Sequence, residues 1–192
     1  DVEIYAACDI NPARLNKTCD RFGIERRYTD VDTMLAELPE LDAADVAPKK
    51  VTIKFKKDII PPAYCSGSMV VVKRDWILNN PDDVGCVVHE LAHAAQYGYR
   101  GTPGWICEGI ADYIRFYVCE PNTDTTVFDP AKIKYDDSYR ISANFFDFVE
   151  RKRPGTVKEL NKLCHKGEYG ETFWTERFNK TLHDLGEAWK KS

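Results

Sequence analysis

Two histidines and a glutamate stand at a spacing that suits metal chemistry. Residues 89–93 read His-Glu-Leu-Ala-His within a stretch whose pattern predicts a helix. Residues four apart share one face of a helix, so the imidazoles of His89 and His93 can reach one ion. Glu90 adjoins the first of them, where its carboxylate can reach a water on the metal without ligating the metal itself. The segment predicts metal-assisted hydrolysis with Glu90 as the general base. The alternative, a buried helix with two hydrogen-bonded histidines, would be costly without an ion.

A catalytic zinc takes three protein ligands and a water, so a third ligand is required. Glu108 follows His93 by fifteen residues and lies one turn into a second predicted helix, which a tight turn can fold back onto the first. Asp112, on the same face of that helix, can accept the Nδ1–H of a ligand histidine and fix its tautomer. The alternative for Glu108 is a carboxylate near the helix N-terminus that the helix dipole stabilises. The alternative for Asp112 is an ordinary buried hydrogen bond.

The elements that must position these residues can be predicted from helix and strand signals. Asn80 and Pro81 are typical of a helix start, as N-cap and first residue, and glycines at 98 and 101 are typical of its end. Residues 51–55 alternate apolar and polar side chains, which predicts a strand. Residues 69–72 form a short segment of mostly β-branched residues, which predicts a second strand. We expect helices over 80–97, 102–119 and 136–149, a loop over 121–130, and two or three shorter helices up to residue 189. The fold class is then α+β, with a small sheet and a mostly helical C-terminal part.

Residues 1–48 follow a different pattern. Predicted strands at 2–8, 27–28 and 42–46 alternate with predicted helices at 11–22 and 32–38, which is typical of βαβ units. The stretch resembles the second to fourth strands of the dinucleotide-binding domain of the glucose–fructose oxidoreductase and inositol dehydrogenase family, in CDINPARL (8–15), RFGIERRYTD (21–30) and DAADVAP (42–48). Asp9 occupies the position that contacts the ribose in that family.

The sequence lacks the other parts of a nicotinamide site. The Gly-rich turn G-x-G-x-x-G, which places the pyrophosphate at a helix N-terminus, does not occur before Asp9, and the family's Glu-Lys-Pro segment is missing too. We therefore expect residues 1–48 to be a truncated, non-functional Rossmann-like βαβ fragment that binds no nicotinamide cofactor.

From residue 49 to the C-terminus, the sequence resembles the plant basic secretory protein family and its bacterial relatives, which are zinc peptidases of the gluzincin kind. The matching segments are VVHELAHAAQ (87–96), PGWICEGIADYIR (103–115) and KYDDSYRISANFFDFVE (134–150), with a weaker match in LHDLGEAWKKS (182–192). The resemblance implies a zincin-like metallopeptidase domain over 49–192, and its E-x-x-x-D pattern maps onto Glu108 and Asp112. It also implies a secreted or cell-envelope protein, although the sequence given shows no signal-peptide pattern.

Peptide hydrolysis needs a donor for the oxyanion besides the metal. Tyr139 is our candidate because it stands at the start of the third helix and matches the family's Asp-x-x-Tyr stretch; Tyr135 is second. Either tyrosine could instead be a half-buried aromatic with a solvated hydroxyl. In zincins an edge strand beside the active-site helix receives the substrate, and the strand at 69–72 is the candidate here.

Composition excludes several other functions. Hydrophobic residues make up 43% of the chain and the net charge is −4, with no basic stripe among aromatics, so nucleic acid is not an expected partner. The apolar runs are too short for a membrane span, and a peptide or protein is the expected substrate. The remaining alternatives are a binding module that keeps zinc without turnover, which the intact Glu90 opposes, and an NAD(P)-dependent oxidoreductase fragment, which the missing glycine turn opposes.

The cysteines, the other two histidines and three of the tryptophans are expected to have structural rather than catalytic roles. Seven cysteines without a CxxC pair predict reduced thiols, with one or two disulfides as the alternative. The cysteines expected to pack as small hydrophobes on helices are Cys86, Cys107 and Cys119. His165 and His183 are expected to be solvated or to cap helices, and the core is expected to contain Trp105, Trp174 and Trp189.

Overall fold

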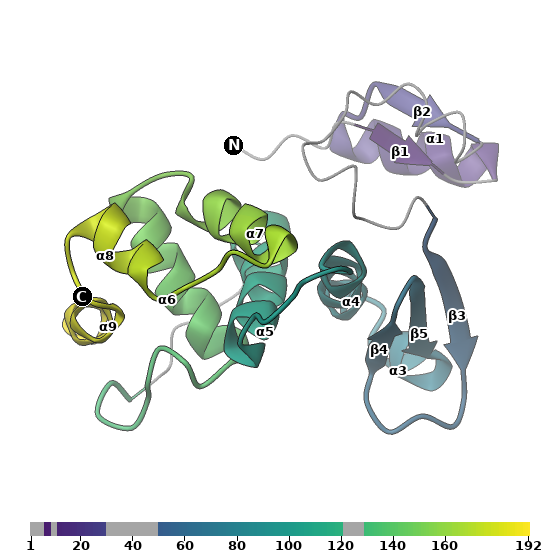
Figure 1. Cartoon of the computed structure of the whole chain (residues 1–192). Helices are drawn as coiled ribbons and strands as arrows, with labels where there is room; N and C mark the ends of the chain where they lie inside the picture. Colours follow the sequence, from purple (N-terminus) through teal and green to yellow (C-terminus); the bar gives the residue numbers. More distant parts are fainter. Residues whose placement is uncertain (1–5, 9–10, 30–49, 121–128) are drawn as a thin grey trace. The chain divides into compact units, whose positions relative to one another are not determined.

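The computed structural model describes residues 6–8, 11–29, 50–120 and 129–192 of the chain. The chain divides into two compact units, Asp1–Ala44 and Asp45–Ser192. Figure 1 shows the first unit in purple and the second in blue to yellow.

The first unit contains a β–α–β element. Strands β1 (Ala6–Cys8) and β2 (Arg26–Tyr28) pair in parallel, and α1 (Pro12–Phe22) connects them. The side chain of Asn11 accepts a hydrogen bond from the Ala13 N–H at the start of α1, which is the usual role of Asn at this place. Leu15, Cys19 and Ile24 form a small buried cluster. These elements confirm the predicted helix and two of the predicted strands. Asp9, the predicted helix at 32–38 and the predicted strand at 42–46 lie outside the described residues.

The second unit begins with a three-stranded sheet. Its strands are β3 (Thr52–Lys56), β4 (Ala63–Ser66) and β5 (Met69–Lys73), in the order β3-β5-β4. The central strand β5 runs parallel to β3 and antiparallel to β4, and its three valines are fully buried. The prediction that residues 69–72 form an edge strand is wrong, because β5 is hydrogen-bonded on both sides. The edge strand that contacts the helix carrying His89 and His93 is β4, and a strand at these residues was not predicted.

The start of the helix that carries His89 and His93 also differs from the prediction. The residues before Asn80 form a short helix, α3 (Arg74–Asn79), and Asn80 is its C-cap rather than the N-cap of the next helix. Pro81 has no N–H with which to continue α3. The next helix, α4 (Gly85–Ala95), begins after a short turn in which the Asp83 carboxylate accepts the N–H of Cys86 and the indole N–H of Trp76. Asn and Pro are typical of both helix starts and helix ends, so the pattern alone could not separate the two.

The remaining chain is helical. Helices α5 (Gly104–Tyr113) and η1 (Ile114–Cys119) cover the predicted helix at 102–119, but η1 is wound as a π-helix, in which the Glu120 N–H bonds the Arg115 carbonyl. The later helices are α6 (Tyr139–Lys152), α7 (Thr156–Lys166), α8 (Thr172–Phe178) and α9 (Leu182–Trp189). The fold class is thus α+β, with a small three-stranded sheet and a mostly helical remainder.

An aromatic core joins these helices. Phe145 of α6 packs against Trp174 and Trp189, both buried, and Trp105 packs on the edge of the same cluster, so all three predicted core tryptophans are confirmed. Helices α5 and α6 approach closely at Gly109, where an added Cβ would lie 2.7 Å from the Phe146 ring. Helix α4 contacts β4 and β5 on one side and α5 and η1 on the other, and it lies between the sheet and α5 in Figure 1.

Two further predictions concern thiols and membranes. The six cysteines whose side chains are described are all free thiols. Cys86 is buried and Cys107 half-buried, but Cys119 is exposed, so its predicted burial is wrong: it lies at the end of η1, where the helix leaves the core.

Among the described helices, none combines the length and the apolar character that a membrane span requires.

Candidate metal centre

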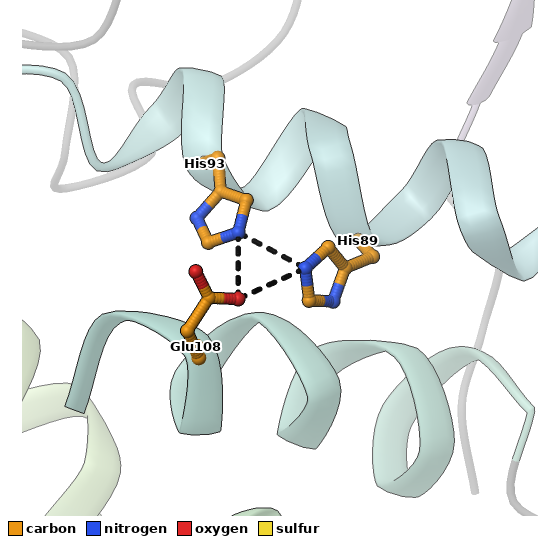
Figure 2. Close-up of side chains that lie close together, drawn as sticks. All are labelled: His89, His93 and Glu108. Carbon is orange, nitrogen blue, oxygen red and sulfur yellow. Dashed lines mark hydrogen bonds and ion pairs between the residues drawn. The ribbon is translucent and has the colours of Figure 1, made fainter. Parts of the chain in front are cut away.

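Three side chains from two helices converge on one point. His89 and His93 extend from α4 and Glu108 from α5, as Figure 2 shows. The Nε2 atoms of the two histidines are 3.0 Å apart. The Glu108 Oε2 atom lies 3.2 Å from the His93 Nε2 atom and 3.3 Å from the His89 Nε2 atom. The three ligands predicted from the sequence are therefore brought together.

The dimensions and the chemistry of the triangle are compatible with a metal ion. Ligands 2.0–2.2 Å from a tetrahedral ion stand about 3.4 Å apart, close to the edges of this triangle. Two imidazole nitrogens and a carboxylate oxygen are also a typical catalytic zinc ligand set. Because each of the three atoms presents a lone pair, the arrangement is stable only around a cation, either a proton or a metal ion.

Each histidine has a hydrogen-bond partner at its Nδ1 atom. Asp112, on α5 and only 5% exposed, places Oδ1 2.7 Å from the His89 Nδ1 atom. Gln96, at the end of α4, places Oε1 2.8 Å from the His93 Nδ1 atom. A carboxylate oxygen can only accept, so the His89 Nδ1 atom carries the proton and its Nε2 lone pair faces the triangle.

Sequence reasoning identified Asp112 but missed Gln96. One signal was available, because Gln96 is the only glutamine of the chain and follows His93 by three residues, which places it on the same helix face. Gln96 has a second partner, because its side-chain N–H donates to the Cys107 carbonyl of α5 at 2.9 Å. That contact could not be inferred from the spacing.

The electrostatics of the triangle favour positive charge. Burial alone would lower the pKa of His89, but hydrogen bonds with Asp112 and Glu108 outweigh it and raise the pKa to about 9. Hydrogen bonds with His89 and then His93 lower the pKa of Glu108 to about 2. The pKa of His93 is also raised, because its bonds with Glu108 and Gln96 outweigh burial. The same contacts that favour protons here favour a divalent cation.

Glu90 lies beside the triangle without belonging to it. Glu90 lines a pocket of about 480 Å³ that His89 also lines. Burial raises the pKa of the Glu90 carboxyl, while the nearby histidines and a hydrogen bond from the Cys65 backbone lower it in part. A carboxylate with a raised pKa beside a metal site has the position of a general base.

The pocket is built from five parts of the second unit. Besides α4 and α5, its wall includes Pro62 and Ala63 at β4 and residues 137–141 at the start of α6. Arg115 and Phe116 of η1 complete it. The guanidinium groups of Arg115 and Arg140 lie 4.6 Å and 4.4 Å from the centre of the Phe116 ring.

Tyr139 reaches the pocket from the first turn of α6. Its ring is 55% exposed and lies nearly parallel to the His89 ring, with 6.1 Å between centroids. The Glu108 carboxylate, and then burial, raise the pKa of Tyr139, so its hydroxyl stays protonated and can donate. Ser138 and Tyr139 both have positive φ angles (68° and 49°), a costly backbone that often occurs at functional sites.

Tyr135, the second candidate, lies elsewhere. Its ring packs in the aromatic core, 5.5 Å from the ring centres of Trp105 and Phe145, and it does not line the pocket. The structure therefore leaves Tyr139 as the tyrosine at the site.

A family model described as "Peptidase of plants and bacteria" matches residues 50–189. The chain belongs to this peptidase family. The matched residues include the whole triangle, Glu90, Asp112 and Tyr139, so the peptidase match and the pocket fall on the same part of the chain. No curated protein and no solved structure matches the chain.

The other histidines, His165 and His183, belong neither to the triangle nor to the lining of the pocket. His183 is exposed, as predicted. The prediction for His165 is wrong: its ring packs edge-on against Tyr99, and its Nδ1 atom is buried without a hydrogen-bond partner among the described residues. The contact arises because α7 folds against the connection between α4 and α5, where the Arg100 N–H bonds the Cys164 carbonyl.

Proposed function

We propose that residues 49–192 form a zincin-like, zinc-dependent metallopeptidase domain that hydrolyses peptide bonds. The convergence of His89, His93 and Glu108 on one point, with an acceptor behind each histidine, carries this proposal. Membership of a peptidase family supports the class of reaction.

His89, His93 and Glu108 would hold the zinc ion. When bound, zinc supplies Lewis-acid chemistry, polarising a carbonyl group and making water acidic near neutral pH. Asp112 holds the proton on the His89 Nδ1 atom, so that the Nε2 lone pair stays available for the ion.

Glu90 moves the proton. Its carboxylate lines the pocket beside His89, where it accepts a proton from the attacking water and returns it to the leaving amine. Its raised pKa suits this role, since a base works best when its pKa is near the working pH.

Tyr139 supplies the hydrogen bond for the carbonyl oxygen. Its protonated hydroxyl is on the pocket wall next to His89, and donation to an oxygen that gains negative charge stabilises the transition state. The strained backbone at Ser138 and Tyr139 fixes the direction of this side chain.

Strand β4 is the candidate to receive an extended substrate. It is an edge strand, it contacts α4, and Ala63 at its start lines the pocket with Pro62. An extended peptide can add to such an edge through main-chain hydrogen bonds. This replaces the earlier assignment to residues 69–72.

The test is zinc analysis of the purified full chain combined with cleavage of an unstructured polypeptide such as casein. We expect about one zinc per chain, loss of cleavage with a chelator, and recovery when zinc is added back. A chain that binds zinc but cleaves no polypeptide would instead be a binding module; the position of Glu90 in the pocket argues against this. Cleavage that a chelator does not affect would exclude the metallopeptidase.

A further inference from the structure

Gln96 hydrogen bonds the Nδ1 atom of His93, just as Asp112 hydrogen bonds the Nδ1 atom of His89. Its Oε1 atom lies 2.8 Å from the His93 Nδ1 atom, its Nε2 atom donates to the Cys107 carbonyl at 2.9 Å, and it is 8% exposed. We propose that Gln96 is a positioning residue, which fixes the tautomer and ring orientation of His93 as a metal ligand. The inference rests on the proposed zinc site.

The Cys107 carbonyl decides which way the amide points. A carbonyl oxygen can only accept, so the Gln96 NH₂ group must face it. The Oε1 atom then faces His93 and can only accept in turn, so the His93 Nδ1 atom must carry the proton. This leaves the His93 Nε2 lone pair facing Glu108 and His89.

The Gln96 amide bonds both His93 and the backbone next to Glu108, and so contacts the surroundings of two of the three proposed ligands. Cys107 directly precedes Glu108, so the bond from Gln96 holds the backbone of α5 next to the third ligand. Gln96 itself is the C-cap of α4, which carries both histidines. One side chain thus sets the His93 ring and the spacing between the helices that meet at the triangle.

The Gln96 amide has no freedom to flip. A flip would set its Oε1 atom against the Cys107 carbonyl oxygen, and both atoms can only accept.

The experiment compares Gln96→Met with Gln96→Glu in the full chain. Methionine removes both hydrogen bonds at similar size, and zinc affinity, measured by competition with a chelator, is expected to fall about 10–100-fold. Glutamate still accepts the His93 Nδ1–H but cannot donate to the Cys107 carbonyl. If Gln96 positions His93, the Glu variant binds zinc more tightly than the Met variant; if Gln96 only tethers α5, it binds no more tightly.

A second measurement observes the proton itself. In the zinc-loaded wild-type protein, proton–nitrogen NMR should show the Nδ1–H signals of both His89 and His93, protected from exchange by their partners. Gln96→Met should lose only the His93 signal to exchange with water, while the Glu variant keeps it. The His89 signal, protected by Asp112, is the internal control.

Asn144 provides a matched control variant. Its amide also bridges two partners, donating to Tyr117 and accepting from Trp189, but away from the triangle. Asn144→Leu should lower the melting temperature and leave zinc affinity and both Nδ1–H signals unchanged. If Gln96→Met does not fold, Gln96→Asn, whose shorter amide cannot reach His93, takes its place.

Two results would overturn the inference. One is wild-type zinc affinity in Gln96→Met with the His93 Nδ1–H signal retained, and the other is a Glu variant that binds zinc no better than the Met variant. A wild-type chain that binds no zinc would instead refute the proposed function, and with it this inference.

Discussion

The Oδ1 atom of Asp112 lies 2.7 Å from the Nδ1 atom of His89, although 23 residues separate the two in the sequence. Packing of α4 on α5 brings them together, and both side chains are buried. A buried carboxylate without a partner is rare because its desolvation is costly. The imidazole N–H satisfies Asp112, and the carboxylate holds the ring toward the triangle.

Replacing Asp112 tests that relationship. We expect Asp112→Ala to cost about 10–100-fold in zinc affinity or activity, because the His89 ring loses the group that fixes its tautomer. Asp112→Asn should cost less, since an amide oxygen can still accept the Nδ1–H. Chelator competition measures both variants. Equal affinities for the wild type and Asp112→Ala would show that the bond is only structural.

Replacing the ligands should remove the metal. Each of His93→Ala and Glu108→Ala leaves two of three protein ligands, so zinc retention should be abolished in the first and strongly weakened in the second. Metal analysis after gel filtration is the measurement. His183→Ala, at an exposed position, is the matched control and should keep its zinc. Stoichiometric zinc in His93→Ala would exclude this ligand set.

Glu90→Gln separates binding from turnover. The variant should keep its zinc, because Glu90 is not part of the triangle, and its hydrolysis should fall by about 10²–10⁴-fold because the general base is lost. Cleavage rates on casein, together with metal content, check both halves. A near wild-type rate would mean that another group takes the proton.

Gly109 should tolerate no side chain. Its Cβ would lie 2.7 Å from the Phe146 Cε2 atom and from the Ser142 Cβ atom, so Gly109→Ala must push α5 and α6 apart. We expect a loss of about 1–3 kcal/mol in the free energy of unfolding, measured by denaturant titration. Gly104→Ala in the same helix meets nothing within 4 Å and is the control. Equal stabilities would show that the two helices can separate freely.

The N-terminal residues should not bind a nicotinamide cofactor. The sequence has no Gly-rich turn to receive the pyrophosphate, so calorimetric titration of the full chain with NAD or NADP should give no binding heat. Micromolar affinity for either cofactor would restore the oxidoreductase alternative.

The sequence predicted which side chains converge better than it predicted the elements around them, for physical reasons. His89, His93, Glu108 and Asp112 follow helical spacing, and local periodicity survives folding. Strand β4 is four residues long and shows no clear alternation, so its pairing with β5 could not be inferred.

Other features depend on contacts that no spacing reveals. Gln96 gains its role from a carbonyl on another helix, eleven residues away. Ser138 and Tyr139 have positive φ angles although neither is glycine, the residue that usually indicates this conformation, so nothing in the sequence indicated it.

The π-helical turn of η1 makes chain length, as well as residue identity, a determinant of the contacts of Arg115, which lines the pocket. The Glu120 N–H reaches back five residues, to the Arg115 carbonyl, instead of the four of an α-helix. Deleting one residue after Phe116 would let the segment wind as an α-helix and rotate the side chains beyond the deletion by about 100°. Glu120 would then leave Arg115, whose guanidinium lies over Phe116 at the pocket. Arg115 would keep its bond to Asp83, at 2.6 Å, so a relative shorter by one residue here would lose one contact beside the pocket while every ligand stayed the same.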